Sequence, residues 1–205
     1  ILSNYLGKFY IVLIGIFMLP FYLNNLGAES YGLVTFFTVF SSSLMILDMG
    51  LTNVLARDAA RFYKNLQKRS ELKRILRSFE FFIYILNILV FSIILLLSDG
   101  IATNWLNSDE LSTSTISSCI KLMGIMFFLK WLVSIKQGII LGSEQHVWLN
   151  LFQIIISTLK FLGGLILIIF ISSDIFHFFI FQSIISMLEF CVIKLKVDKF
   201  FIGTK

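Results

Sequence analysis

Charged residues are scarce in this chain: Asp, Glu, Lys and Arg make up 14% of its 205 residues, whereas 58% of the residues are hydrophobic. Soluble domains average about 25% charged and about 45–50% apolar residues, so this composition argues against a water-soluble fold. The net charge of +5 would suit a nucleic-acid partner. The cations gather at the ends of apolar runs, however, where they indicate membrane topology and lipid headgroups instead.

Cysteine and histidine are rare as well, with two residues of each. Cys119 and Cys191 are expected near opposite faces of the membrane, too far apart for a disulfide. His146 and His177 stand alone, and no Cys/His cluster has the spacing of metal ligands. The sequence also lacks a recognisable nucleophile–base pair, Gly-rich phosphate loop or acidic catalytic pair. We therefore expect no metal, no cofactor and no enzymatic activity.

Six apolar runs are long enough to cross a bilayer, whose hydrocarbon layer of about 30 Å requires about 20 helical residues. The expected spans are residues 9–26, 31–47, 81–97, 116–135, 148–171 and 175–193. The predicted fold class is all-α: one transmembrane domain over residues 1–205 that forms a six-helix bundle. Pro20, the only proline, lies in the first span. It is either a bending point for gating or a static kink that improves packing.

Basic residues concentrate between the second and third expected spans. This basic segment contains Arg57, Arg61, Lys64, Lys68, Arg69, Lys73, Arg74 and Arg77. Such a cluster marks the cytoplasmic side of a membrane protein. Lys136 is expected on the same side, in the connection after the fourth span, whereas the outer segments 24–30 and 172–174 contain no Lys or Arg. We therefore expect both ends of the chain in the cytoplasm.

Lys130 and Lys160 fall inside the fourth and fifth spans, where a charge costs at least ~2.5–3.5 kcal/mol by insertion scales. Charged residues at this depth usually face a cavity or a partner. The two lysines are therefore candidates for lining one vestibule that binds an anionic passenger, such as a diphosphate joined to a polyprenyl chain. The alternative is that their long side chains snorkel to the membrane surface.

Three further charged residues lie near the inner ends of spans. Asp48 is a candidate for neutralising a lysine or coupling transport to protons or sodium ions, and a simple helix-end role is equally open. Glu189 is a second candidate for the same roles, but Lys194 and Lys196 are near enough in sequence to favour a local pairing. Arg57 is expected at the inner mouth, as a substrate contact or as a headgroup contact.

Two stretches of the chain carry a family resemblance. The first contains the segments LPFYLNNLGAESYGLVTFF and LDMGLTNVLARDAARF, and the second contains GIILGSEQHVWLN. The distinctive features are Pro20, the Leu26-Gly27-Ala28-Glu29 turn with Tyr31-Gly32, Asp48-Met49-Gly50, and Arg57 with Ala60-Arg61. Residues of about 10–61 and 136–165 thereby resemble Wzx-type O-antigen flippases. These are lipid-linked oligosaccharide translocases of the multidrug/oligosaccharidyl-lipid/polysaccharide exporter superfamily.

The resemblance implies a multi-pass protein of the bacterial inner membrane. Such a flippase translocates undecaprenyl-diphosphate-linked oligosaccharide repeat units for O-antigen or capsular polysaccharide assembly, by alternating access through a cationic cavity. The resemblance also implies that this chain is the amino-terminal half of a two-lobed protein of twelve or more helices. Its implied partners are the polyprenyl-diphosphate-linked oligosaccharide, membrane lipids, and the polysaccharide polymerase with its chain-length machinery.

Other functions stay open at this point. A cation-coupled multidrug exporter of the same superfamily would favour acidic residues in the cavity, whereas lysines dominate here. A membrane-embedded polysaccharide polymerase or glycosyltransferase would need an outer loop with catalytic Arg, His or Asp, and residues 98–118 contain no Arg or His. A structural membrane scaffold would have no need of intramembrane lysines.

Overall fold

The computed structural model describes residues 2–48, 50–63, 66–104 and 110–201, and every regular element within them is a helix. The all-α prediction is therefore confirmed. In chain order the elements are α1 (Leu2–Leu26), α2 (Ala28–Leu44), the 3-10 helix η1 (Met45–Asp48), α3 (Leu51–Phe62), α4 (Leu66–Asn104), α5 (Thr113–Gly142), α6 (His146–Thr158), the π-helix η2 (Leu159–Gly163), α7 (Gly164–Phe170) and α8 (Ile175–Phe200).

Five helical segments among the described residues are long and apolar enough to cross a membrane. They are Gly7–Leu26, Lys68–Asn104, Thr113–Gly142, His146–Phe170 and Ile175–Phe200. This indicates a membrane-embedded helical bundle. The six-span count is not confirmed, because α2, which covers most of the expected span 31–47, has 17 residues and ends at Leu44.

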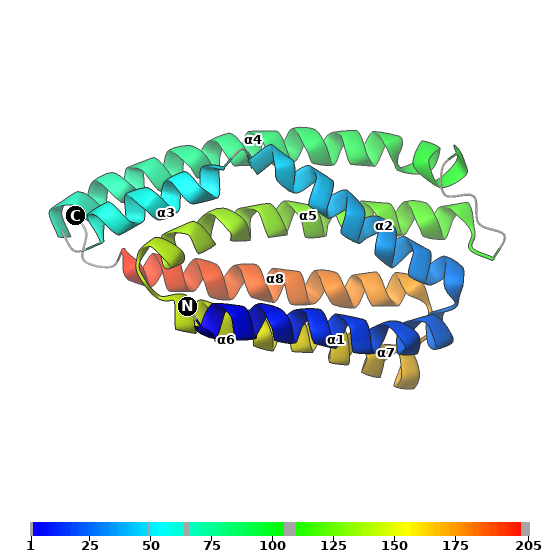
Figure 1. Cartoon of the computed structure of the whole chain (residues 1–205). Helices are drawn as coiled ribbons and strands as arrows, with labels where there is room; N and C mark the ends of the chain where they lie inside the picture. Colours follow the sequence, from blue (N-terminus) through cyan, green and yellow to red (C-terminus); the bar gives the residue numbers. More distant parts are fainter. Residues whose placement is uncertain (1, 49, 64–65, 105–109, 202–205) are drawn as a thin grey trace.

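The chain bends between α2 and α3. Gly50 has a φ of 81°, a left-handed conformation that glycine adopts without steric cost. Asp48 accepts hydrogen bonds from the backbone N–H and the hydroxyl of Thr52, at 3.2 and 3.0 Å, and so caps the first turn of α3. In Figure 1, α2 crosses obliquely over α5, and α3 continues toward the end of the bundle where α1 begins. The second passage is thus divided between two helices.

α4 is much longer than the expected span 81–97, because it also contains most of the basic segment. Its 39 residues extend about 58 Å at ~1.5 Å per residue, almost twice the hydrocarbon thickness of ~30 Å. With α3, its first turns form a helical hairpin at one end of the bundle, which we call the basic end (Figure 1). Arg69 stabilises this hairpin, because its guanidinium donates two hydrogen bonds to the Tyr63 carbonyl oxygen. The guanidinium carbon also lies 4.7 Å from the centroid of the Phe200 ring of α8.

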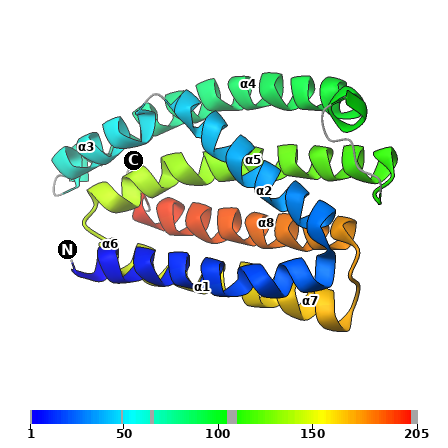
Figure 2. The same cartoon turned by 45° about the vertical axis from the view of Figure 1, so that its right-hand side comes forward.

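α5 is the central helix of the bundle. It packs against α3, α4 and α8, and both views show it between α4 and α8 (Figures 1 and 2). Large side chains fill the contacts: Phe127, Trp131 and Ile135 are at most 1% exposed. Of the five long apolar segments, α5 is the most buried.

Two glycines one turn apart on α5 allow α3 to approach closely. A Cβ at Gly138 would lie 2.6 Å from the Thr52 carbonyl oxygen, and one at Gly142 would lie 2.2 Å from the Ala56 carbonyl oxygen. Small residues at this spacing are typical of close helix pairs in membranes. Packing against α3 therefore gives a physical reason for both glycines of the GIILG segment.

The structure differs from the sequence prediction at Lys136. This residue lies inside α5, is 5% exposed, and forms an ion pair with Glu80 of α4. A buried charge requires such a partner because its desolvation is otherwise uncompensated. The expected connection after the fourth span is correspondingly shorter, since α5 continues to Gly142 and α6 begins at His146.

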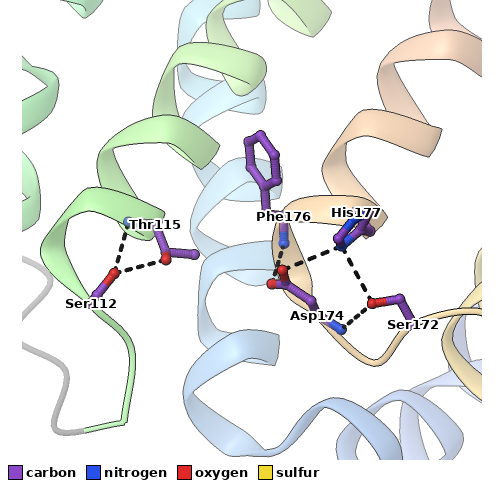
Figure 3. A network of polar contacts seen from close by, with 6 residues as sticks. All are labelled: Ser112, Thr115, Ser172, Asp174, Phe176 and His177. Atoms are coloured by element: carbon purple, nitrogen blue, oxygen red, sulfur yellow. Dashed lines mark hydrogen bonds and ion pairs between the residues drawn. The ribbon is translucent and has the colours of Figure 1, made fainter.

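The opposite end of the bundle carries polar helix caps (Figure 3). Ser112 accepts a hydrogen bond from the Thr115 backbone N–H at 3.1 Å, and Asp174 accepts one from the Phe176 N–H at 3.0 Å. His177, which the sequence leaves alone, contacts the Asp174 carboxylate at 3.3 Å. Because these caps satisfy the first free N–H groups of α5 and α8, they mark where both helices begin.

Candidate functional site

A cavity of ≈ 440 Å³ lies among α1, α2, α5, α6, η2 and α8, and we call it the central cavity. Its charged lining residues are Lys130, Lys160 and Glu189. The structure therefore brings both intramembrane lysines to one hollow, although their roles stay predictions. With two lysines and one glutamate, the lining has a net charge of +1.

Lys130 supplies the unpaired charge of the central cavity. It lies on α5 with an exposed side chain, and no hydrogen bond or ion pair joins its ammonium to another described residue. Val133, less than one turn further along α5, also lines the cavity. An ammonium with three free donors on a flexible stem can bind an anion as a point charge.

Lys160 and Glu189 form an ion pair across the cavity wall. The Lys160 Nζ lies 2.7 Å from the Glu189 Oε2, and the two side chains are 29% and 17% exposed. Glu189 therefore contacts a residue 29 positions away, whereas the sequence favoured its neighbours Lys194 and Lys196. Because Glu189 compensates its charge, Lys160 is less available than Lys130 to an incoming anion.

Lys160 lies in the π-helix η2, which interrupts the fifth expected span. π-helical turns are rare and occur frequently at functional sites. Two side chains bind carbonyl oxygens of this turn: Tyr22 donates to Phe161 at 2.7 Å, and Gln182 donates to Lys160 at 2.9 Å. These contacts join α1 and α8 to the backbone of the turn that carries Lys160.

The adjacent glycines make this arrangement possible. A Cβ at Gly163 would lie 2.7 Å from the Phe181 ring, and one at Gly164 would lie 2.8 Å from the Tyr22 hydroxyl. The close approach is therefore made by side chains of α1 and α8. Either substitution would push these side chains out of place.

Three other predicted site residues do not line the central cavity. Arg57 lies on α3 with 62% of its side chain exposed and contacts Asp58 at 3.4 Å. Asp48 caps α3 through Thr52, which matches the helix-end alternative. Pro20 is exposed and lies within the continuous helix α1.

Several residues that line the central cavity were not predicted from the sequence as site residues. Their polar members include Tyr22, Thr35, Thr38, Ser157, Gln182 and Ser186. The threonine hydroxyls bind carbonyls of their own helix: Thr35 donates to Gly32 at 2.8 Å and Thr38 to Val34 at 2.9 Å. Spacing along a helix could have grouped Gln182, Ser186 and Glu189 on one face of α8, since they recur at intervals of about one turn.

Comparison with known proteins gave no match. Neither a family model, nor a curated protein, nor a solved structure matches this chain. The flippase resemblance therefore stays a prediction, and the functional argument depends on the geometry of the central cavity.

Proposed function

We propose that this chain forms part of a membrane flippase that translocates polyprenyl-diphosphate-linked oligosaccharides. In this proposal the anionic diphosphate enters the central cavity and the lipid tail stays in the bilayer. The observation that carries the proposal is the unpaired Lys130 ammonium in a cavity between membrane-spanning helices. An ammonium that makes no ion pair on a membrane-spanning helix is stabilised when an anion binds to it.

Each charged residue of the cavity has a distinct role in the proposal. Lys130 binds the diphosphate directly. Lys160 is held by Glu189 at rest, and the arriving diphosphate competes with the Glu189 carboxylate for it. Because the resting cavity carries a net charge of +1, it attracts an anion before the Lys160–Glu189 pair opens.

The proposal extends to topology and location. The six-passage arrangement counts α2 with η1 and α3 as the second passage, so that α1 begins and α8 ends at the same end of the bundle. The basic end would face the cytoplasm of a bacterial inner membrane, since it carries most of the cations. Arg57 and its basic neighbours on the hairpin then contact anionic lipid headgroups.

The presence of Glu189 in the cavity supports a second candidate, a cation-coupled exporter of the same superfamily. A carboxylate there is a binding group for a cationic compound or a coupling ion. The two candidates differ in which substitution stops transport: Lys130→Gln for the anionic lipid, and Glu189→Gln for a cationic dye.

The test is transbilayer movement of a fluorescent polyprenyl diphosphate in proteoliposomes that contain the complete flippase of which this chain forms part. A hydrogen bond to a charged group contributes about 1.5–3 kcal/mol, so Lys130→Gln should slow the movement about 10- to 100-fold. Lys121→Gln is the matched control, because Lys121 is on the same helix and does not line the central cavity. Equal rates for Lys130→Gln and Lys121→Gln in the complete flippase would refute the proposal.

A further inference from the structure

A second polar cavity lies at the basic end of the bundle. Its volume is ≈ 550 Å³, and its walls come from α1, α3, α5, α6 and the turn between α5 and α6. We call it the end cavity. Its polar lining residues are Lys8, Gln137, Glu144, His146, Asn150 and Gln153. In Figure 1, α3, the end of α5 and the beginning of α6 lie toward this end.

The end cavity and the central cavity lie on successive turns of the same helices. On α5, Val133 lines the central cavity and Gln137 lines the end cavity. On α6, Ser157 and Gln153 have the same relation. Four helical residues rise about 6 Å, so on both helices the lining residues of the two cavities lie about one turn apart.

The two cavities differ in charge. In the end cavity, the positive charge of Lys8 is offset by the negative charge of Glu144, whereas the central cavity has an excess of one positive charge. The amides of Gln137 and Gln153 each supply a carbonyl acceptor and two N–H donors. Hydroxyl groups of a carbohydrate also donate and accept, so an uncharged polyhydroxylated ligand matches this lining better than a second anion.

The backbone at Glu144 belongs to the C-terminal cap of α5. Glu144 has a φ of 60°, and it is the only described non-glycine residue with a positive φ. The Gln145 N–H donates to the Ile140 carbonyl oxygen and the Glu144 N–H donates to the Leu141 carbonyl oxygen. These two hydrogen bonds form a Schellman motif, in which the residue after the C-cap adopts a left-handed conformation. The cap places Glu144 on the wall of the end cavity.

We propose that the end cavity binds the carbohydrate part of the cargo while the diphosphate occupies the central cavity. This inference rests on the proposed function. The first sugar is bonded directly to the diphosphate, so binding sites one helical turn apart suit the two moieties. Lys8 and Glu144 then form the charged part of the end cavity, and the Gln137 and Gln153 amides select for sugar hydroxyls.

Cysteine protection tests both cavities in one experiment. Ser157→Cys reports on the central cavity and Gln153→Cys on the end cavity, each in a full-length chain that also carries Cys119→Ala and Cys191→Ser. The labelling rate with a membrane-impermeant thiol reagent is measured in open membrane sheets. The two probes are undecaprenyl diphosphate and the same lipid carrying a chitobiose disaccharide.

We expect both lipids to protect Ser157→Cys, but only the glycosylated lipid to protect Gln153→Cys. At a lipid concentration ten times Kd, occupancy slows labelling about tenfold. Equal protection of Gln153→Cys by both lipids, or by neither, overturns the carbohydrate assignment and leaves the diphosphate site intact. Loss of protection at Ser157→Cys with both lipids overturns the proposed function itself. Reactivity of both cysteines without lipid shows that the variants keep their open cavities.

Discussion

Replacing Gly142 with alanine is the sharpest test of the packing between α3 and α5. The added Cβ would lie 2.2 Å from the Ala56 carbonyl oxygen and 2.6 Å from the Ala59 Cβ. The first of these atoms belongs to the backbone, so α3 has to move as a unit. Overpacking costs about 1–3 kcal/mol, and a backbone clash places this variant near the upper value.

A gain in helix propensity opposes this cost. Alanine is favoured over glycine in a helix interior by up to about 1 kcal/mol, so the expected net destabilisation is about 2 kcal/mol. For a chain of this size, about 1 kcal/mol lowers Tm by about 2–4 °C. Gly142→Ala should therefore lower Tm by about 4–8 °C in detergent micelles, as measured by the loss of helical circular dichroism.

Gly100→Ala is the matched control for this experiment. Gly100 lies in α4, and a Cβ there would meet no atom within 4 Å. The same substitution should leave Tm unchanged or raise it slightly, since only the gain in propensity remains. If both variants have the same Tm, α3 does not pack against α5 as described.

Two other predictions concern buried polar contacts. Lys136→Met leaves the Glu80 carboxylate without its partner and should destabilise the chain by about 3–5 kcal/mol, whereas the double variant Lys136→Met/Glu80→Leu should recover most of this loss. Thermal unfolding of the single and double variants measures the difference. Equal Tm values for the two would contradict the buried ion pair. Tyr22→Phe removes the hydrogen bond to the Phe161 carbonyl oxygen and should lower stability by about 1 kcal/mol, whereas Tyr10→Phe, which loses only an exposed contact with Thr158, should change Tm less.

The fold class followed from the sequence because hydropathy is a local property. Runs of about 20 apolar residues identify membrane helices without knowledge of tertiary contacts. The division of the second passage was not predicted, since the run 31–47 is uniformly apolar or hydroxyl-bearing. Its cause lies just beyond, in the left-handed Gly50 and the Asp48–Thr52 cap. Such local conformations compete with hydropathy at the end of a span.

The candidate site was predictable to the extent that intramembrane charge is costly. That argument singled out Lys130 and Lys160, which line the central cavity. The same argument failed for Lys136. This lysine follows the end of an apolar run and was therefore assigned to a connection outside the membrane, whereas in the structure it lies inside the bundle and forms an ion pair with Glu80. Pairings such as Lys160–Glu189, between residues distant in the sequence, depend on helix packing. A single sequence does not reveal that packing.

The affinity of the purified chain for undecaprenyl diphosphate, compared with undecaprenol, tests the central claim most directly. The two lipids differ only in the anionic group, so their affinity ratio isolates what the central cavity contributes. We expect the diphosphate to bind at least about tenfold more tightly, a difference of about 1.4 kcal/mol, and Lys130→Gln to abolish this preference while Lys121→Gln retains it. Equal affinity of the wild-type chain for both lipids would contradict an anion site at Lys130.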